Sequence, residues 1–327
     1  MHNDDNDKKP IAAGHAEDLH PEMQVLVSRR KATSATDESL EARRKAWTIY
    51  SLTLAAERPT DLGVRDTVIE HSGLVIPVRI YTPPGAAGKS MPCVVYLHGG
   101  GFMLGDLDSS DFIAWGIADQ ASCIVVSVDY PLSPEHPYPV AFDASYACTE
   151  WLYLNGSSVG IDTSRIAIAG DSAGANLAAA VCLAARDRGG PAIVAQALAY
   201  PWLTHETAAP SRTKFAQGPG LTTDGLVAYG DAYIGNVATN QRDPYAWPLH
   251  AENFADLPPA WVHVAERDPA RDDGRRYAAA LIGAGVELGF REAPHTIHAF
   301  LRARFAGPMA ASEFGRFTAF LKHALHD

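Results

Sequence analysis

The sequence has no excess of positive charge and no long hydrophobic run, and each absence excludes a class of protein. Its formal net charge is −11, and its isoelectric point is near 5.6. A surface of this sign repels the phosphates of nucleic acids and anionic lipid head groups. No run approaches the roughly 18 consecutive apolar residues that a membrane-spanning helix needs. We therefore expect a protein that neither binds nucleic acid nor spans a membrane.

Cysteine is also scarce, and the start of the chain is polar. The four cysteines lie singly in apolar segments, without the paired spacing of a metal site, as small buried thiols do: Cys93, Cys123, Cys148 and Cys182. Residues 1–8 are polar and acidic and have no apolar core, unlike a secretory signal. These features predict a soluble, cytoplasmic protein.

What the sequence does contain is enough apolar material for a large core. It has 327 residues, of which 47% are hydrophobic, and this suits one sizeable α/β domain with an accessory element, or two domains. After a polar segment at 1–20, residues 21–57 have a helical pattern. The residues spaced to share one helical face are Leu40, Trp47, Tyr50 and Leu54. Such a face covers either the core or a cleft.

Short apolar runs alternate with helical segments over the rest of the chain. The expected strands are 64–70, 74–81, 93–97, 123–128, 165–169, 194–200, 261–265 and 286–292, the first two joined by a turn at Ser72-Gly73. The expected helices lie between these strands and after the last one, at 111–120, 141–154, 177–186, 271–283 and 312–326. This alternation predicts an α/β fold with a mostly parallel, doubly wound sheet. The pattern breaks at 204–248, which we interpret as an insertion with one helix near 224–234.

One pentapeptide organises the chemistry: Gly170-Asp171-Ser172-Ala173-Gly174. It follows an apolar strand and precedes an alanine-rich helical segment, which is the arrangement of a nucleophile elbow, G-x-S-x-G. In such an elbow a strained turn projects the serine hydroxyl from the sheet, and small flanking residues let strand and helix approach closely. Taken alone, the pentapeptide is equally compatible with a tight turn that has no catalytic role. Ser172 therefore needs supporting residues elsewhere.

A serine hydroxyl becomes a nucleophile only with a base, a carboxylate that orients the base, and donors for the carbonyl oxygen. The donor candidate is the glycine loop 98–102, His-Gly-Gly-Gly-Phe, directly after the 93–97 strand. Its glycines let backbone N–H groups approach a substrate. A dinucleotide-binding loop is the alternative, but the glycine spacing lacks the continuation that such a loop requires. We interpret His98 as a residue that holds this loop.

The acid and base candidates follow later strands, in the order serine, acid, histidine. Asp268 stands just after the 261–265 strand, at the carboxyl edge of the sheet, and Glu266 is the alternative acid. Asp272 and Asp273 are assigned to the first turn of the next helix, where negative charge is favoured.

The preferred base is His298, on the loop after the 286–292 strand, and His295 is its competitor. Two histidines three residues apart also suggest a metal pair. No third ligand follows at the spacing of a metalloprotease, so we expect no metal.

Together these segments resemble the hormone-sensitive-lipase-like family of α/β-hydrolases, and bacterial acetyl esterases in particular. The segments that carry the resemblance are 98–101, 129–139, 170–174, 268–269 with 271–274, and 298–300. They occur in the family's order, within a match that covers about residues 60–327. The resemblance implies an α/β-hydrolase fold with Ser172 as nucleophile, Asp268 as acid and His298 as base. It also implies no cofactor and an oxyanion hole formed by three backbone amides, those of Gly100, Gly101 and Ala173.

The resemblance further implies a cap over the site, built from the N-terminal helices and the insertion. It divides the chain into cap helices at 1–57, core at 58–203, a cap insertion at 204–248 and the rest of the core at 249–327. We expect an aromatic cap drawn from six residues: Trp47, Tyr50, Trp202, Phe215, Tyr229 and Tyr233.

Three residues depart from the family's pattern without removing a catalytic atom. Pro131 stands where arginine is usual, so we expect a local ion pair to be missing. Ala270 replaces a common leucine, and Ala299 replaces the more frequent glycine. Glu135 and His136, in the proline-rich loop 129–139, are interpreted as scaffold for the site.

These observations predict a cofactor-free serine carboxylesterase that cleaves short-to-medium acyl esters through an acyl-enzyme, with a small-molecule ester as its partner. Two alternatives stay open. The same triad could hydrolyse an amide, a formamide or a lactone, and a receptor on this fold could bind a small ligand without catalysis. Plant gibberellin receptors resemble these enzymes but lack the histidine, so the presence of His298 favours the enzyme. The sequence leaves a homodimer open.

Overall fold

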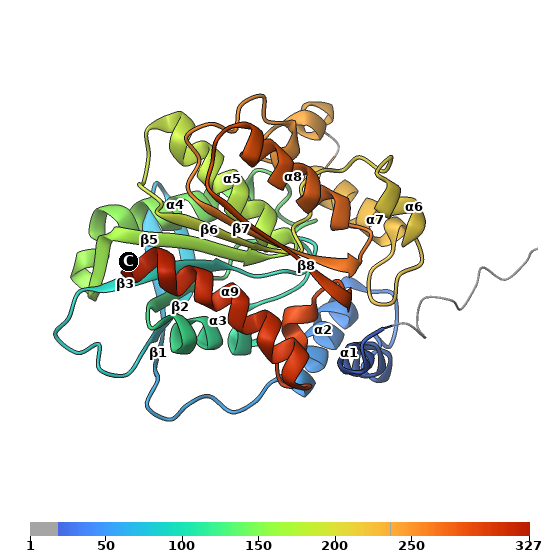
Figure 1. Ribbon diagram of the computed structural model, residues 1–327, viewed down its shortest axis with the longest axis horizontal. Helices are drawn as coiled ribbons and strands as arrows, with labels where there is room; N and C mark the ends of the chain where they lie inside the picture. Colours follow the sequence, from blue (N-terminus) through green and yellow to red (C-terminus); the bar gives the residue numbers. More distant parts are fainter. Residues whose placement is uncertain (1–18, 236) are drawn as a thin grey trace, which may run out of the picture.

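The alternating strands and helices assemble into one mixed sheet (Figure 1). The computed structural model describes residues 19–235 and 237–327. Their strands form an eight-stranded sheet in the order β1-β2-β4-β3-β5-β6-β7-β8. β2 runs antiparallel to both β1 and β4, and all other neighbours are parallel, so the expected mostly parallel sheet is confirmed. The strands are β1 (Gly63–His71), β2 (Leu74–Thr82), β3 (Met91–Leu97), β4 (Ile124–Val128), β5 (Ile161–Asp171), β6 (Ala195–Ala199), β7 (Ala260–Arg267) and β8 (Leu288–Ile297).

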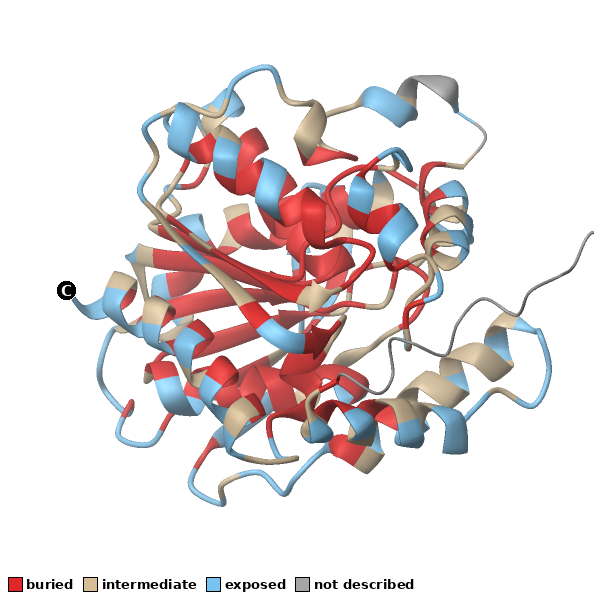
Figure 2. Cartoon of the chain, turned by 45° about the vertical axis from the view of Figure 1, so that its right-hand side comes forward, coloured by how far each residue is buried: buried red, intermediate tan, exposed pale blue. Residues whose placement is uncertain are grey.

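Helices cover both faces of this sheet (Figure 1). One face packs against α4 (Val140–Asn155), α5 (Ala173–Arg188) and α8 (Arg271–Gly283). The other packs against α3 (Leu107–Ala121) and the closing helix α9 (Pro308–His326). Figure 2 shows the central strands buried along most of their length, with exposed residues on the outer sides of the helices. The helices lie between strands as the sequence predicts, with α5 beginning directly after Ser172.

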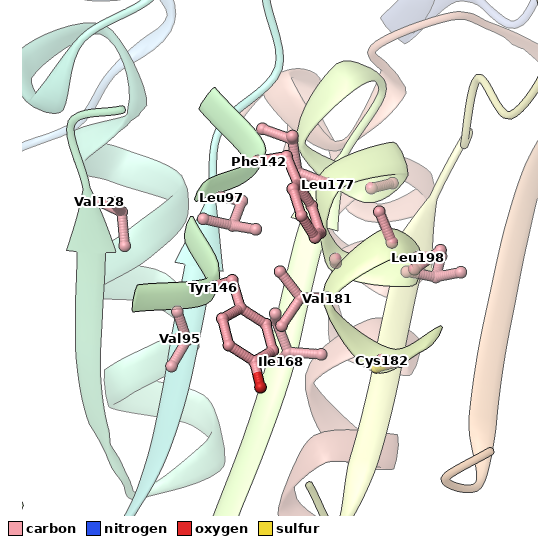
Figure 3. Packing of buried hydrophobic residues seen from close by; sticks show 14 of the residues in the cluster. Val95, Leu97, Val128, Phe142, Tyr146, Ile168, Leu177, Val181, Cys182 and Leu198 are labelled. Atoms are coloured by element: carbon pink, nitrogen blue, oxygen red, sulfur yellow. The ribbon is translucent and has the colours of Figure 1, made fainter. Parts of the chain in front are cut away.

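The two faces are packed with side chains of different size, because alternate residues of a strand point to opposite sides. Figure 3 shows the face toward α4 and α5, where Val95, Leu97 and Ile168 meet Phe142 and Leu177. On the other face the strands β5 and β6 present fully buried alanines: Ala167, Ala169, Ala195, Ala197 and Ala199. These small side chains leave room for α9, whose phenylalanines complete that core. Burying each such ring contributes about 1.5–3 kcal/mol.

A buried carboxylate joins α9 to the edge of the sheet. Glu313 of α9 is 3% exposed and accepts hydrogen bonds from His263 of β7 and Arg291 of β8. The distances are 3.0 Å from His263 Nε2 to Oε2 and 2.6 Å from Arg291 Nη2 to Oε1. A charge this deep in the core needs both partners, since burial alone disfavours the ionised form.

Four further helices lie beyond the end of the sheet at which β7 and β8 finish (Figure 1). They are α1 (Pro21–Ala32), α2 (Leu40–Leu54), α6 (Pro210–Lys214) and α7 (Thr223–Ile234). The helical pattern at 21–57 is thus two helices, and Ser39 caps the second by accepting the amide of Ala42. The sequence predicts one helix in the insertion, near 224–234, and gives no sign of α6, which is too short to show a helical period. Residues 1–18 of the expected N-terminal segment lie outside the described residues.

Candidate active site

The backbone around Ser172 makes the tight turn that the elbow motif requires. Ser172 lies between β5 and α5 at φ 55° and ψ −117°, a backbone conformation that residues other than glycine rarely adopt. A Cβ atom on Gly174 would lie 1.9 Å from the carbonyl oxygen of Leu97, and one on Gly170 would lie 2.3 Å from that of Gly174. Both positions therefore require glycine. The Ser172 amide donates to the carbonyl of Ala199 at 2.9 Å, which fixes the turn against β6.

Three side chains from separate elements form one hydrogen-bonded chain. The Ser172 hydroxyl lies 2.7 Å from His298 Nε2, and His298 Nδ1 lies 2.7 Å from Asp268 Oδ2. Asp268 is fully buried, and its other oxygen accepts the amide of Ala270 at 2.7 Å. The carboxylate favours the tautomer with the proton on Nδ1, which leaves Nε2 to accept the serine proton. This is the geometry of a nucleophile, a base and an orienting acid.

The competing acid and base lie apart from this chain and contact each other instead. The Glu266 carboxylate accepts the backbone amide of His295 at 2.5 Å. β8 continues to Ile297, past the expected strand end at residue 292, because Arg267 of β7 still pairs with Ile297. This extension places His295 inside the strand and His298 directly after it.

The glycine loop faces the same cavity as Ser172. Gly100 and Gly101 both line that cavity, at φ 147° and φ 62°. A Cβ atom on Gly100 would lie 2.0 Å from the Leu104 carbonyl oxygen. Within the described part of the chain, no hydrogen bond uses the amide of Gly100 or Gly101. Ala173 is buried and is the first residue of α5, where helix amides have no acceptor within the helix. All three amides therefore lack an acceptor among the described residues.

Asp171 positions this loop, a role that the sequence analysis missed. One carboxylate oxygen of Asp171 accepts the Gly99 amide at 2.8 Å and the Tyr96 hydroxyl at 2.7 Å, and the other accepts the Tyr200 hydroxyl at 3.3 Å. The only signal in the sequence was its place as the second residue of the G-x-S-x-G pentapeptide.

His98 is built into the loop's support. Its ring stacks on Tyr130 at 4.3 Å between ring centroids, and its backbone carbonyl accepts the Tyr130 hydroxyl at 2.5 Å. Burial lowers the pKa of His98 and so favours the neutral ring. A Cβ atom on Gly105 would lie 2.5 Å from this ring, so the loop closes tightly around it. These contacts agree with a loop-holding role.

Two carboxylates of α8 hold the start of the insertion. The sequence placed both in the first turn of a helix but did not indicate these contacts. Asp273 accepts the amides of Leu203 and Thr204 and forms an ion pair with Arg212 at 2.9 Å. Burial raises the pKa of Asp273 to about 6, although Arg212 and the two amides act in the opposite direction. Asp272 accepts the amide of Ser211 at 2.8 Å. The two carboxylates in the first turn of α8 therefore hold the 203–211 segment as well as interacting favourably with the positive end of the helix dipole.

The cavity above Ser172 has a largely apolar wall. Four of the six expected aromatics line it: Trp47, Tyr50, Trp202 and Tyr229. The other two do not line this cavity. Phe215 is buried and lies under the Arg271 guanidinium, and Tyr233 stacks on Phe102 at 3.6 Å. A sequence does not distinguish an aromatic ring that faces a cavity from one that fills the core.

The structure shows the surroundings of two of the three departures from the family pattern, Pro131 and Ala299. Arg44 of α2 forms a bidentate ion pair with Glu135, at 2.7 and 2.8 Å, and donates to the carbonyls of Met103 and Ser133. This ion pair holds the pKa of Glu135 at about 2. The loop beside Pro131 thus has an ion pair supplied by the N-terminal segment. Ala299 lies at φ 69°, where glycine is the less strained residue.

The described residues contain no group of three metal-ligating side chains. Among them, no helix is both long and apolar enough to cross a bilayer. The four cysteines are buried and unpaired, as expected for small apolar thiols.

Comparison with known proteins identifies the family of this chain. Residues 94–302 match a family described by the alpha/beta hydrolase fold. Carboxylesterase NlhH of Mycobacterium tuberculosis is 38% identical over 312 residues, 94% of this chain and 97% of its own length. Esterase LipI of the same organism is 41% identical over 267 residues, 81% of this chain and 83% of its own.

Solved esterases have the same fold over nearly the whole chain. A thermostable esterase from Pseudomonas putida ECU1011 superimposes with a TM-score of 0.89 at 29% identity, covering 94% of this chain and 98% of its own. The Pyrobaculum calidifontis esterase gives a TM-score of 0.85 at 34% identity, covering 93% and 98%. This chain therefore belongs to the α/β-hydrolase family, in the hormone-sensitive-lipase-like branch that its motifs resemble.

Proposed function

We propose that this protein is a serine carboxylesterase that hydrolyses short-to-medium acyl esters through an acyl-enzyme on Ser172. One observation carries the proposal: the Ser172–His298–Asp268 chain lies at the wall of an apolar cavity, with both hydrogen bonds at 2.7 Å. The carboxylesterase class is supported by the family and by relatives that cover most of the chain.

In the first half of the reaction, His298 Nε2 takes the hydroxyl proton as Ser172 Oγ bonds to the ester carbonyl carbon. The carbonyl oxygen becomes an oxyanion that accepts hydrogen bonds from the amides of Gly100, Gly101 and Ala173. Such a donor contributes about 2.7–4 kcal/mol to transition-state stabilisation. The carbon–oxygen bond to the alcohol then breaks, and His298 protonates the departing alcohol.

In the second half, a water molecule replaces the alcohol. His298 takes a proton from that water as its oxygen attacks the acyl carbon, and the bond to Ser172 Oγ then breaks as His298 returns the proton to Oγ. The products are the carboxylic acid and the free enzyme. Asp268 stays ionised throughout and stabilises the imidazolium that forms in each half.

We further propose that α1, α2 and the 204–248 insertion act together as the cap. Side chains of both segments line the cavity, among them Trp47 of α2 and Tyr229 of α7. A Cβ atom on Gly101 would lie 2.7 Å from the Tyr229 ring, so the insertion closes directly over the oxyanion loop. The bulky wall near Ser172 favours short acyl chains.

Substitution of the nucleophile tests the proposal. Ser172→Ala removes the attacking oxygen, and we expect hydrolysis of p-nitrophenyl acetate and butyrate to fall by at least about 10⁴-fold. Ser164→Ala is the matched control, because Ser164 is an exposed residue of the same strand. Wild-type activity in a folded Ser172→Ala variant would contradict the mechanism.

A further inference from the structure

The mouth of the catalytic cavity carries positive charge on a protein whose net charge is −11. Two outer hollows share Arg30 and Tyr229 with the cavity that contains Ser172. Arg43 lines both outer hollows, and Lys31 lines one of them. Among the described residues, no aspartate or glutamate lines either outer hollow. The approach to Ser172 is therefore locally cationic.

Aromatic rings of the cavity hold both guanidinium groups. The Arg30 guanidinium carbon lies 5.5 Å from the Trp47 ring centroid, and that of Arg43 lies 5.4 Å from the Tyr229 ring centroid. Both arginines are half-buried. A guanidinium over the face of a ring makes a cation–π contact that uses none of its N–H donors, and these form the fork that matches a carboxylate. The two arginines are thus pre-positioned donors beside the wall of the site.

Neither arginine is neutralised by a protein carboxylate. In residues 19–235 and 237–327, Arg30 and Arg43 form no ion pair and no side-chain hydrogen bond, whereas the adjacent Arg44 pairs with Glu135. Carboxylates are not scarce, since the chain has 38 Asp and Glu against 27 Lys and Arg. Because no protein carboxylate neutralises these two arginines, they can bind an anion that comes from outside the protein.

The helix dipoles do not explain why both Arg30 and Arg43 lie at this cavity mouth. Arg30 lies in the last turn of α1, where a cation interacts favourably with the helix dipole. Arg43, however, is the fourth residue of α2, near the positive end of that helix, where the dipole disfavours it. The position of Arg43 therefore calls for a partner other than its own helix.

We propose that this cavity selects esters that carry a second, anionic group, in the simplest case a carboxylate, bound at the mouth by Arg30 and Arg43 while the ester carbonyl lies at Ser172. This inference rests on the proposed esterase function. The anion belongs to either the acyl or the alcohol part of the substrate, and matched substrates distinguish the two.

The test compares each anionic ester with a neutral partner of nearly the same shape. One pair is p-nitrophenyl hydrogen glutarate and its methyl ester, with the charge on the acyl part. The other is 3-acetoxybenzoate and methyl 3-acetoxybenzoate, with the charge on the alcohol part. The readout is the ratio of kcat/KM for the anionic ester to that for the neutral one. Because both are measured on one preparation, a partial folding defect does not change the ratio.

We expect the ratio for at least one pair to fall about ten-fold in the double variant Arg30→Gln, Arg43→Gln, because a charge-assisted hydrogen bond is lost. Lys45→Gln is the control, since Lys45 is an exposed cation of α2 that lines a different hollow. Added salt should lower the wild-type ratio as well.

A fall confined to the glutarate pair assigns the anion to the acyl part, and one confined to the acetoxybenzoate pair assigns it to the alcohol. Ratios that stay within about two-fold of wild type for both pairs, with the neutral esters hydrolysed, overturn the inference and leave the esterase function standing. A wild-type protein that hydrolyses none of the four esters contradicts the proposed function itself.

Discussion

At the scale of single residues, the site depends on carboxylates as much as on its serine. The Asp268 carboxylate lies within hydrogen-bond distance of His298, and Asp171 joins the amide of Gly99 to two tyrosine hydroxyls. Asp268 was predictable from the sequence, because its place after a strand and before a proline is local. The role of Asp171 was not, because its partner Gly99 is 72 residues away. Contacts between distant segments leave no pattern in the sequence around either residue.

Glu313 gives a prediction of pH dependence at this scale. Burial acts to raise the pKa of Glu313, but the hydrogen bonds from His263 and Arg291 outweigh it and hold the pKa at about 2, below its ordinary value of 4.5. A carboxyl group whose pKa is lower in the folded than in the unfolded protein stabilises the fold at pH values above the unfolded pKa. This stabilisation is lost as the pH falls through 4.5 toward 2.

Glu313→Gln should therefore lower the free energy of unfolding by about 2–3 kcal/mol at neutral pH. Urea unfolding should show this deficit shrinking by half or more near pH 3, since the wild-type advantage is then being titrated away. The control Glu287→Gln changes an exposed carboxylate of the loop before β8 and should have little effect. A deficit that is the same at neutral and acid pH would contradict this account.

At the scale of elements, the insertion is attached to the core by a buried ion pair. Arg212 of α6 and Asp273 of α8 have 2% and 0% of their side chains exposed. The sequence predicted α8 at 271–283, but α6 was missed because five residues do not complete two helical turns. A helical repeat of apolar residues can be recognised only in a longer segment, whereas a tertiary ion pair can stabilise even a short helix.

Breaking this pair should loosen the insertion. Asp273→Asn removes the negative charge and leaves the Arg212 cation buried, and such a loss costs about 3–5 kcal/mol. We expect a lower free energy of unfolding and faster cleavage within 204–248 in limited proteolysis. Asp256→Asn, the same chemical change at an exposed residue, is the control. Unchanged unfolding and cleavage in Asp273→Asn would show that the insertion is held by other contacts.

At the scale of the whole molecule, composition gives the sign of the net charge but not where the charges lie on the surface. The net charge of −11 correctly describes an acidic protein, yet the mouth of its cavity is cationic. A net charge is a sum over the surface and says nothing of where charges of each sign gather. The alternation of strands and helices and the mostly parallel sheet were evident from the sequence, because each element is a local pattern, whereas the order of the strands in the sheet was not.

The central claim is that Ser172 is a nucleophile activated by His298. The most direct measurement is covalent labelling with a fluorophosphonate, followed by mass spectrometry of the intact protein and its peptides. The account predicts one adduct per chain, on Ser172, with labelling abolished in Ser172→Ala and slowed by several orders of magnitude in His298→Ala. No adduct on the folded wild-type protein, or an adduct on another serine, would contradict it.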